Sequence, residues 1–224
     1  MGENAQTRWA LDGRVGTIVI DNPPMNVLSD VNRRGILAAL AEFRAAGARA
    51  VVISGHGDRA FCGGADLKEE ERLTPDIVED FQRRGAEVNR ALRQFEHPVI
   101  AAINGWTMGG GLVLALWCDI RIGSTRAKLG AVGVKVGLMA SNVQLARLCP
   151  EGRARDMLLT GRAVEAEEAL RLGVLSAVVA PDALMEEAAA WARMIAARPA
   201  HTVARAKRIL NAALEPREAL MAAR

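Results

Sequence analysis

Two glycine-bearing segments constrain this chain more than any other feature of its sequence. They are Ala60–Asp66, with adjacent Gly63 and Gly64, and Asn104–Gly111, which ends in three glycines. Each follows a strand-like apolar run and leads into a helical pattern, which leaves backbone N–H groups exposed at the positive end of a helix dipole. Two such amides meeting at one point would bind a developing oxyanion, so the pattern indicates chemistry on a carbonyl compound.

The apolar runs around the two segments predict alternating strands and helices. Thr74-Pro75 is a favourable cap and first residue for a helix, and His97-Pro98 is a stop signal for it. Gly161 and Gly173 are predicted helix C-caps. We expect strands at 15–20, 50–54, 99–103, 120–122 and 174–179, and helices beginning at 29 or 30 and at 75, at 110–118, and over 181–214 with a break at Arg198-Pro199.

Composition excludes several classes of protein. The net charge of +3 is spread over interleaved acidic and basic residues, so no nucleic-acid partner is indicated. No run approaches the ~18 apolar residues of a membrane span, so no membrane partner is expected either. Cys62, Cys118 and Cys149 are widely spaced and form no C-x-x-C pair, which indicates neither zinc nor disulfides and favours a cytoplasmic location.

Other glycine-loop chemistries fail on spacing. The chain has no G-x-x-x-x-G-K-[ST] phosphate loop and no early G-x-G-x-x-G dinucleotide fingerprint. It also lacks a G-x-S-x-G nucleophile elbow and an H-E-x-x-H zinc motif. The sequence therefore predicts no metal and leaves paired N–H donation as the chemistry of the two segments.

These residues resemble the crotonase (enoyl-CoA hydratase/isomerase) superfamily. Ala60–Asp66, and Pro98–Gly105 with Gly109–Gly111 and Cys118-Asp119-Ile120, are similar to its two characteristic blocks. Further similar segments are Asn22–Asn26, Leu159–Gly161, Ala166–Ala169 and Leu172–Leu175. Several blocks match in order over most of 15–213, which makes the resemblance specific.

The resemblance implies a fold and a ligand. The fold would be α/β, a spiral of ββα units over residues 1–180 with two roughly perpendicular sheets, followed by a C-terminal helical region over 181–224. The ligand would be an acyl-CoA thioester, so that coenzyme A is part of the substrate and no cofactor is bound permanently. The family also implies a homo-trimer or hexamer. The chain stops at Arg224, where family members continue into further helices, and this weakens the expected assembly.

Site residues carry over by position. The resemblance implies that the N–H groups of Ala65 and Gly110 hold the thioester oxygen. It places the backbone of Gly63 and Ala65 and the side chain of Lys68 along the coenzyme A moiety, and it has Asp66 organise this loop and the helix after it.

The sequence departs from the family at two positions. Family hydratases have glutamates that position water and handle the α proton, and the matching residues here are Val113 and Gly133. Since general acid–base help contributes roughly 10²–10⁴ in rate, a hydratase lacking both should be weak. Three hypotheses stay open: a hydratase/isomerase that relies on its two amides, a decarboxylase, hydrolase or isomerase acting on an unusual acyl-CoA, and a non-catalytic acyl-CoA-binding protein.

Few side chains are candidates to replace the glutamates. Ser141 and Asn142 stand where the family turn faces the acyl group, so either could orient substrate, although Ser141 also suits a helix N-cap. Glu69–Glu71 are interpreted as a solvated face. His56, His97 and His201 are interpreted as turn, helix-end and helical-tail residues, and Cys62 is not expected to be a nucleophile.

Overall fold

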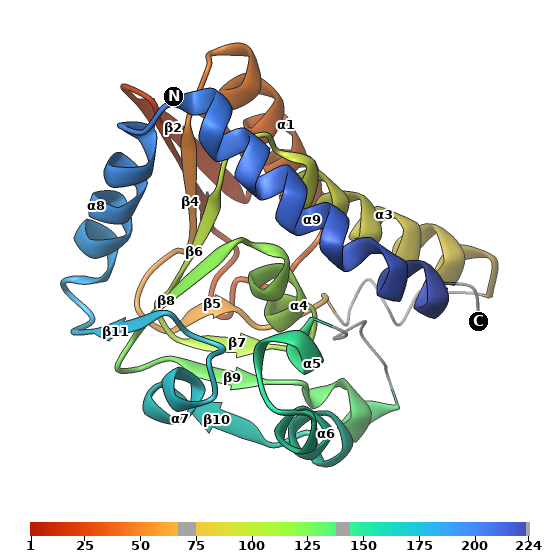
Figure 1. Ribbon diagram of the computed structural model, residues 1–224. Helices are drawn as coiled ribbons and strands as arrows, with labels where there is room; N and C mark the ends of the chain where they lie inside the picture. Colours follow the sequence, from red (N-terminus) through yellow and green to blue (C-terminus); the bar gives the residue numbers. More distant parts are fainter. Residues whose placement is uncertain (67–74, 138–143, 223–224) are drawn as a thin grey trace.

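Two β-sheets form the centre of the fold, and helices cover them (Figure 1). The computed structural model describes residues 1–66, 75–137 and 144–222. The large sheet has the strand order β1-β2-β3-β4-β6-β8-β11, with β1 Gly2–Asn4, β2 Thr7–Asp12, β3 Val15–Ile20, β4 Ala50–Gly55, β6 Val99–Ile103, β8 Ile120–Ser124 and β11 Ala177–Val179. The small sheet has the order β10-β9-β7-β5, with β5 Ala60–Cys62, β7 Trp106–Met108, β9 Lys128–Gly130 and β10 Ala163–Glu165.

A repeated unit connects the two sheets. In β4–β5, β6–β7 and β8–β9, the first strand joins the large sheet and the second joins the small sheet. The small-sheet strands β5, β7 and β9 run across the direction of β4 (Figure 1). In the described range an α-helix follows each of the first two pairs and a 3₁₀ turn follows the third, so the predicted α/β fold of ββα units with a helical C-terminal region is confirmed.

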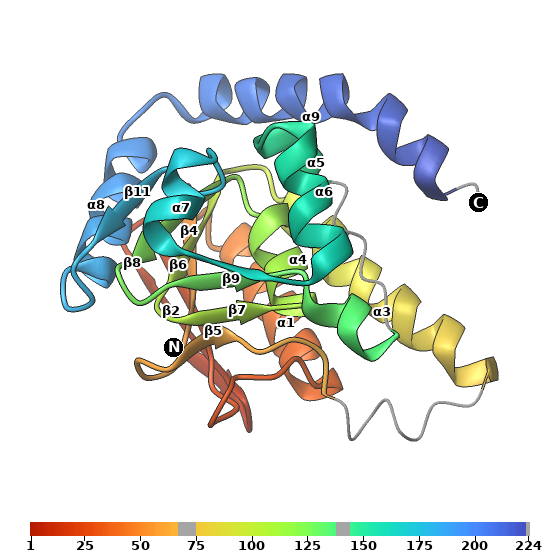
Figure 2. The ribbon, with the colours of Figure 1, turned by 90° about the horizontal axis from the view of Figure 1, so that it is seen from below.

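The helices pack on both faces of the large sheet. Their bounds are α1 Asp30–Ala45, α3 Pro75–Gln94, α4 Gly110–Trp117, the 3₁₀ turn η1 Val132–Val136, α5 Leu145–Leu148, α6 Glu151–Thr160, α7 Ala166–Arg171, α8 Leu184–Ala196 and α9 Ala200–Ala222. Ile53 and Val51 of β4 face the core that contains α1 and α4, whereas Val52 faces α8. Since both faces are covered, β4 is an apolar run without alternation. Figure 2 shows α9 on the outside of the molecule.

Most predicted elements are present, with some shifts in their bounds. The strands at 15–20 and 99–103 match, and α8 and α9 separate at the predicted break. Gly161 has φ +64° at the end of α6, as its predicted C-cap role requires. The strand predicted at 174–179 covers only Ala177–Val179, because Val174 and Leu175 are buried in the core before the ladder begins. The helix predicted to end at His97-Pro98 ends at Gln94.

The turn after α3 contains a histidine whose titration affects stability. Burial is the main cause that holds the pKa of His97 below its ordinary value of 6.5, and the charges of Arg49 and Lys207 act in the same direction against Glu96. Its buried Nδ1 has no hydrogen-bond partner within the described residues. The folded state therefore favours neutral His97.

This pKa shift predicts a loss of stability in mild acid. The contribution of His97 is complete above pH 6.5 and is lost as the pH falls through its lowered folded-state pKa. We expect the thermal midpoint to fall more between pH 7 and pH 5 in the wild type than in His97→Gln, measured by circular dichroism. His201→Gln, which changes an exposed histidine on α9, should behave as the wild type. Parallel curves for wild type and His97→Gln would contradict this assignment.

Candidate functional site

The two glycine segments lie side by side because β5 and β7 are parallel neighbours in the small sheet. A methyl group placed on Gly110 would lie 3.4 Å from the Ala65 nitrogen, and one placed on Gly64 would lie 3.5 Å from the Gly110 nitrogen. The amides of Ala65 and Gly110 are therefore close neighbours in space, although 45 positions separate them in the chain.

A turn from the N-terminal part of the chain holds the first amide in place. The Gly63 amide donates to the Met25 carbonyl at 2.7 Å, and the Leu28 amide donates to the Gly64 carbonyl at 2.7 Å. The Asp66 amide in turn donates to the Leu28 carbonyl at 3.4 Å. Leu28 and Ala65 form a parallel bridge, in which the residues before and after Ala65 make the hydrogen bonds to Leu28. In this pattern the amide of the middle residue points away from the bonded partner. The Ala65 N–H consequently points away from this turn.

Asn26 fixes that turn against the first glycine segment. Its side chain is 1% exposed, and its backbone has φ +51°, a conformation that asparagine tolerates better than most residues. Its Nδ2 donates to the carbonyls of Ala60 at 2.7 Å and His56 at 3.0 Å. The sequence marks Asn26 as part of a family-like turn but does not reveal this contact, because only the folded chain brings these carbonyls to it.

The second amide belongs to the first turn of α4. Gly110 is the first residue of this helix, where N–H groups have no intrahelical acceptor, and its N-cap residue Gly109 has no side chain to supply one. Gly109 itself is anchored, since its amide donates to the Gly130 carbonyl at 2.9 Å. Within the described part of the chain, neither the Ala65 amide nor the Gly110 amide donates to a carbonyl.

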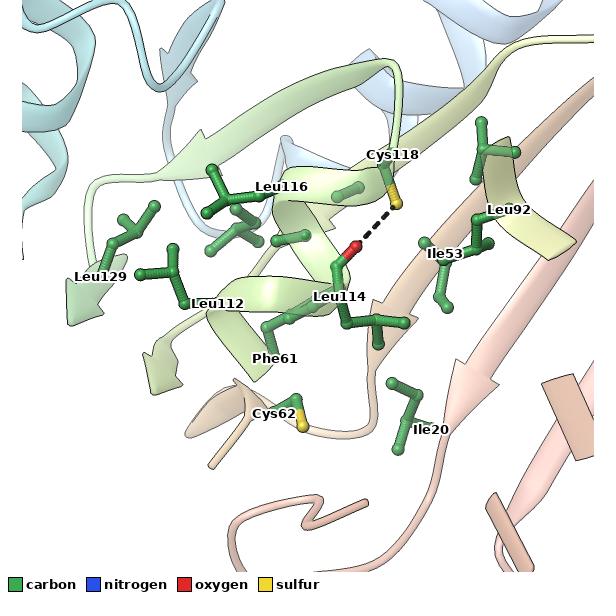
Figure 3. Close-up of a cluster of buried hydrophobic side chains, with 14 of the residues drawn as sticks. Ile20, Ile53, Phe61, Cys62, Leu92, Leu112, Leu114, Leu116, Cys118 and Leu129 are labelled. Carbon is green, nitrogen blue, oxygen red and sulfur yellow. Dashed lines mark hydrogen bonds between the residues drawn. The ribbon is translucent and has the colours of Figure 1, made fainter. Parts of the chain in front are cut away.

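Two glycines allow the segments to approach this closely. Gly64 has φ +112°, and a methyl group on it would lie 3.0 Å from the Met108 carbonyl oxygen. A methyl group on Gly111 would overlap the Cys62 carbonyl oxygen. Figure 3 shows Cys62 beneath α4, whose Leu112 and Leu114 side chains fill the adjoining core.

Several side chains beside the glycines of the two segments are apolar. A methyl group on Gly63 would lie 3.0 Å from the Met25 side chain and 3.6 Å from Val27. Val132 lies beside Gly109, and Val113, on the second turn of α4, is 6% exposed. Gly133, the other position matching a family glutamate, lies in η1 and has no side chain.

Other candidate residues are accounted for separately. Lys68, Glu69–Glu71, Ser141 and Asn142 lie outside the described residues. Cys62 is fully buried, and burial raises the pKa of its thiol to about 12, which disfavours a thiolate nucleophile. His56 is exposed and its Nδ1 lies 2.8 Å from the Arg8 guanidinium.

A cavity of about 490 Å³ lies elsewhere, between α8 and the outer face of the large sheet. Its lining includes Arg8, His56, Asn104 and Leu184, but neither Ala65 nor Gly110. In the described residues, no group of three His, Cys, Asp or Glu side chains gathers closely enough to hold a metal ion. None of the described helices is both long and apolar enough to cross a membrane.

Comparison with known proteins gives the family. Residues 11–224 match the family model described as enoyl-CoA hydratase/isomerase, and the chain belongs to this enzyme family. A probable enoyl-CoA hydratase of Rhizobium meliloti (strain 1021) is 38% identical over 211 residues, which cover 91% of this chain and 80% of that protein. The (E)-benzylidenesuccinyl-CoA hydratase of Thauera aromatica is 42% identical over 151 residues, which cover 66% of this chain and 59% of that relative.

Solved structures agree with this assignment. Pseudomonas aeruginosa DspI superposes with a TM-score of 0.91 and 31% identity, covering 96% of this chain and 84% of that one. An enoyl-CoA hydratase from Bacillus anthracis superposes with a TM-score of 0.88 and 31% identity, covering 92% of this chain and 82% of that one. The predicted superfamily is therefore confirmed, whereas the roles of the individual site residues stay predictions.

Proposed function

We propose that this protein is an acyl-CoA enzyme of the enoyl-CoA hydratase/isomerase type whose two amides, those of Ala65 and Gly110, bind the thioester oxygen. The observation that carries the proposal is that these amides are close neighbours and neither donates to a carbonyl in the described residues. Removing an α proton or adding water at the β carbon both place negative charge on that oxygen. A preorganised donor is typically worth about 3 kcal/mol in such a state.

The remaining parts of the site follow from family membership. In this proposal Gly63, Ala65, Asp66 and Lys68 lie along the coenzyme A moiety, which enters as part of the substrate. Ser141 or Asn142 orients the acyl group. We also propose a trimeric or hexameric assembly and a cytoplasmic location, which follow from the family resemblance and from the cysteine usage.

A second candidate reaction is the decarboxylation of an acyl-CoA that carries a carboxylate on its α carbon. Val132, whose side chain lies beside Gly109, and Val113, which is 6% exposed in α4, are apolar and favour this reaction. An ionised carboxylate next to an apolar wall is poorly solvated, which raises its energy before reaction. The electron pair of the breaking C–C bond passes into the enolate, so CO2 leaves without a base at position 113 or 133. A non-catalytic acyl-CoA-binding protein is the third candidate.

Restoring the two carboxylates tests the proposed function. We expect wild-type protein to bind coenzyme A esters in calorimetry and to hydrate a short enoyl-CoA slowly. Val113→Glu with Gly133→Glu should raise hydration by about 10²-fold or more, since both proton-handling positions are then filled. The hydration rate is followed by loss of enoyl absorbance, with each single variant as a control.

The same assay separates the candidates. CO2 release from malonyl-type esters by the wild type would favour the decarboxylase, and binding without any turnover would favour the binding protein. No measurable binding of any coenzyme A ester would contradict all three.

A further inference from the structure

A buried arginine lies at the C-terminal end of α4. Arg121 is 5% exposed and projects from β8. Its Nη1 donates to the carbonyls of Cys118 at 2.8 Å and Ala115 at 3.3 Å, and its Nε donates to the Val174 carbonyl at 2.8 Å. Arg121 forms no ion pair with the acidic groups of the described residues. A guanidinium group keeps its proton in such a setting, so its charge is present.

The neighbouring groups do not cancel this charge. Cys118 is adjacent, but burial raises the pKa of its thiol to about 12, and its Sγ–H group lies 3.4 Å from the Leu114 carbonyl oxygen (Figure 3). The Asp119 carboxylate receives a hydrogen bond from Lys207 Nζ at 2.7 Å and another from the Val99 amide at 2.7 Å. Asp119 and Lys207 thus form a neutral pair, which leaves the Arg121 charge at this end of the helix.

The opposite end of α4 is the Gly110 amide. The helix has eight residues, of which Gly111–Leu116 are buried. Eight residues span about 12 Å, so Arg121 and the thioester oxygen would lie at the two ends of a short, buried helix. A positive charge at a helix C-terminus also stabilises the helix through its dipole.

We infer that Arg121 is a positioning residue of the proposed reaction, which fixes the C-terminal end of α4 and stabilises negative charge at its Gly110 end. This inference rests on the proposed oxyanion role of Gly110. One unit charge about 12 Å away, in a medium with an effective dielectric constant near 20, changes a rate by about tenfold.

A chromophoric substrate analogue separates electrostatic support from a purely structural role. A push–pull aromatic enoyl-CoA, 4-(dimethylamino)cinnamoyl-CoA, absorbs at longer wavelength when its thioester carbonyl is polarised. We expect Arg121→Met to reduce the red shift of the bound analogue and to lower kcat for hydration about tenfold, with KM little changed. Asp119→Asn removes a negative charge from the same end of α4, so it should increase the red shift. A structural role predicts that both variants disturb the site in the same direction.

The outcomes are distinct. If both variants shift the absorption in the same direction, or if Arg121→Met binds the analogue with the wild-type red shift, the inference is wrong. If Arg121→Met does not fold, Arg121→Lys is tested instead. This variant keeps the positive charge, so its bound analogue is expected to keep the wild-type red shift even if the variant is less stable. A red shift that decreases along with the stability of Arg121→Lys would overturn the inference. If the wild type shows neither binding nor a red shift, the proposed function itself fails, which is a separate result.

Discussion

Replacing Gly110 by proline is expected to lower kcat/KM of the acyl-CoA reaction by about 100- to 1,000-fold while the protein stays folded. Proline has no N–H to donate, so the variant removes one of the two proposed donors. Because Gly110 is the first residue of α4, proline is compatible with the helix there, where its fixed φ suits the first turn. The measurement is steady-state hydration of a short enoyl-CoA by wild type and Gly110→Pro, with circular dichroism to verify folding.

A proline at the start of another helix is the matched control. Glu151 is the first residue of α6 and is exposed, and Glu151→Pro makes the same backbone change at that N-terminus. This control should keep wild-type kinetics. Equal rates for Gly110→Pro and the wild type would end the proposal that the Gly110 amide binds the substrate oxygen.

The longer elements were predictable because their sequence pattern is strong. The run Val99–Ile103 lies between Pro98 and Asn104-Gly105, and it forms β6 with the predicted bounds. In contrast, β5, β7 and β9 have three residues each, too few to show a period of two. Their partners are also distant in sequence, so the small sheet had no local signal. In the sequence, the small sheet was indicated by the glycines on either side of these strands.

The sequence pattern predicts that two amides meet at the candidate site, but it does not predict the residues that hold them in place. Asn26 and Leu28 act through contacts with residues 30 or more positions further along the chain. The prediction of a strand at 120–122 did not reveal that Arg121 is buried or that its guanidinium donates to backbone carbonyls. These contacts are tertiary and join residues at no fixed spacing along the chain, so no sequence pattern predicts them.

The last helix shows the same limit most clearly. A helix rich in Ala and Arg is expected to bury its apolar residues and expose its charges. In α9, however, Ile209 and Leu210 are 58% and 66% exposed, whereas Lys207 is 6% exposed. Among residues 200–213, Lys207 is the one fully buried position. Its burial depends on acceptors from α3, from the turn after α3 and from the turn after α4, which no pattern within α9 reveals.

Replacing Lys207 by methionine is therefore expected to destabilise the protein by about 2–4 kcal/mol, or about 5–15 °C in thermal midpoint. The ammonium group donates to the carbonyls of Leu92 and His97, both at 3.1 Å, and to Asp119 Oδ2 at 2.7 Å. Methionine has a similar length but donates nothing, so it leaves a carboxylate and two carbonyls without this donor. The loss stays below that of a fully buried pair because the Asp119 side chain is 26% exposed and can bind water.

Urea unfolding provides the measurement and a lysine elsewhere provides the control. Lys128 pairs with Glu165 at 2.9 Å, but the two side chains are 36% and 65% exposed, so Lys128→Met should cost less than about 1 kcal/mol. Asp119→Asn in the Lys207→Met background removes the unpaired charge and should recover part of the loss. If Lys207→Met costs no more than Lys128→Met, the buried ammonium does not hold α9 to the ends of α3 and α4. If instead the double variant loses the sum of the two single losses, then Lys207 and Asp119 are not coupled, because additivity is the behaviour of independent sites.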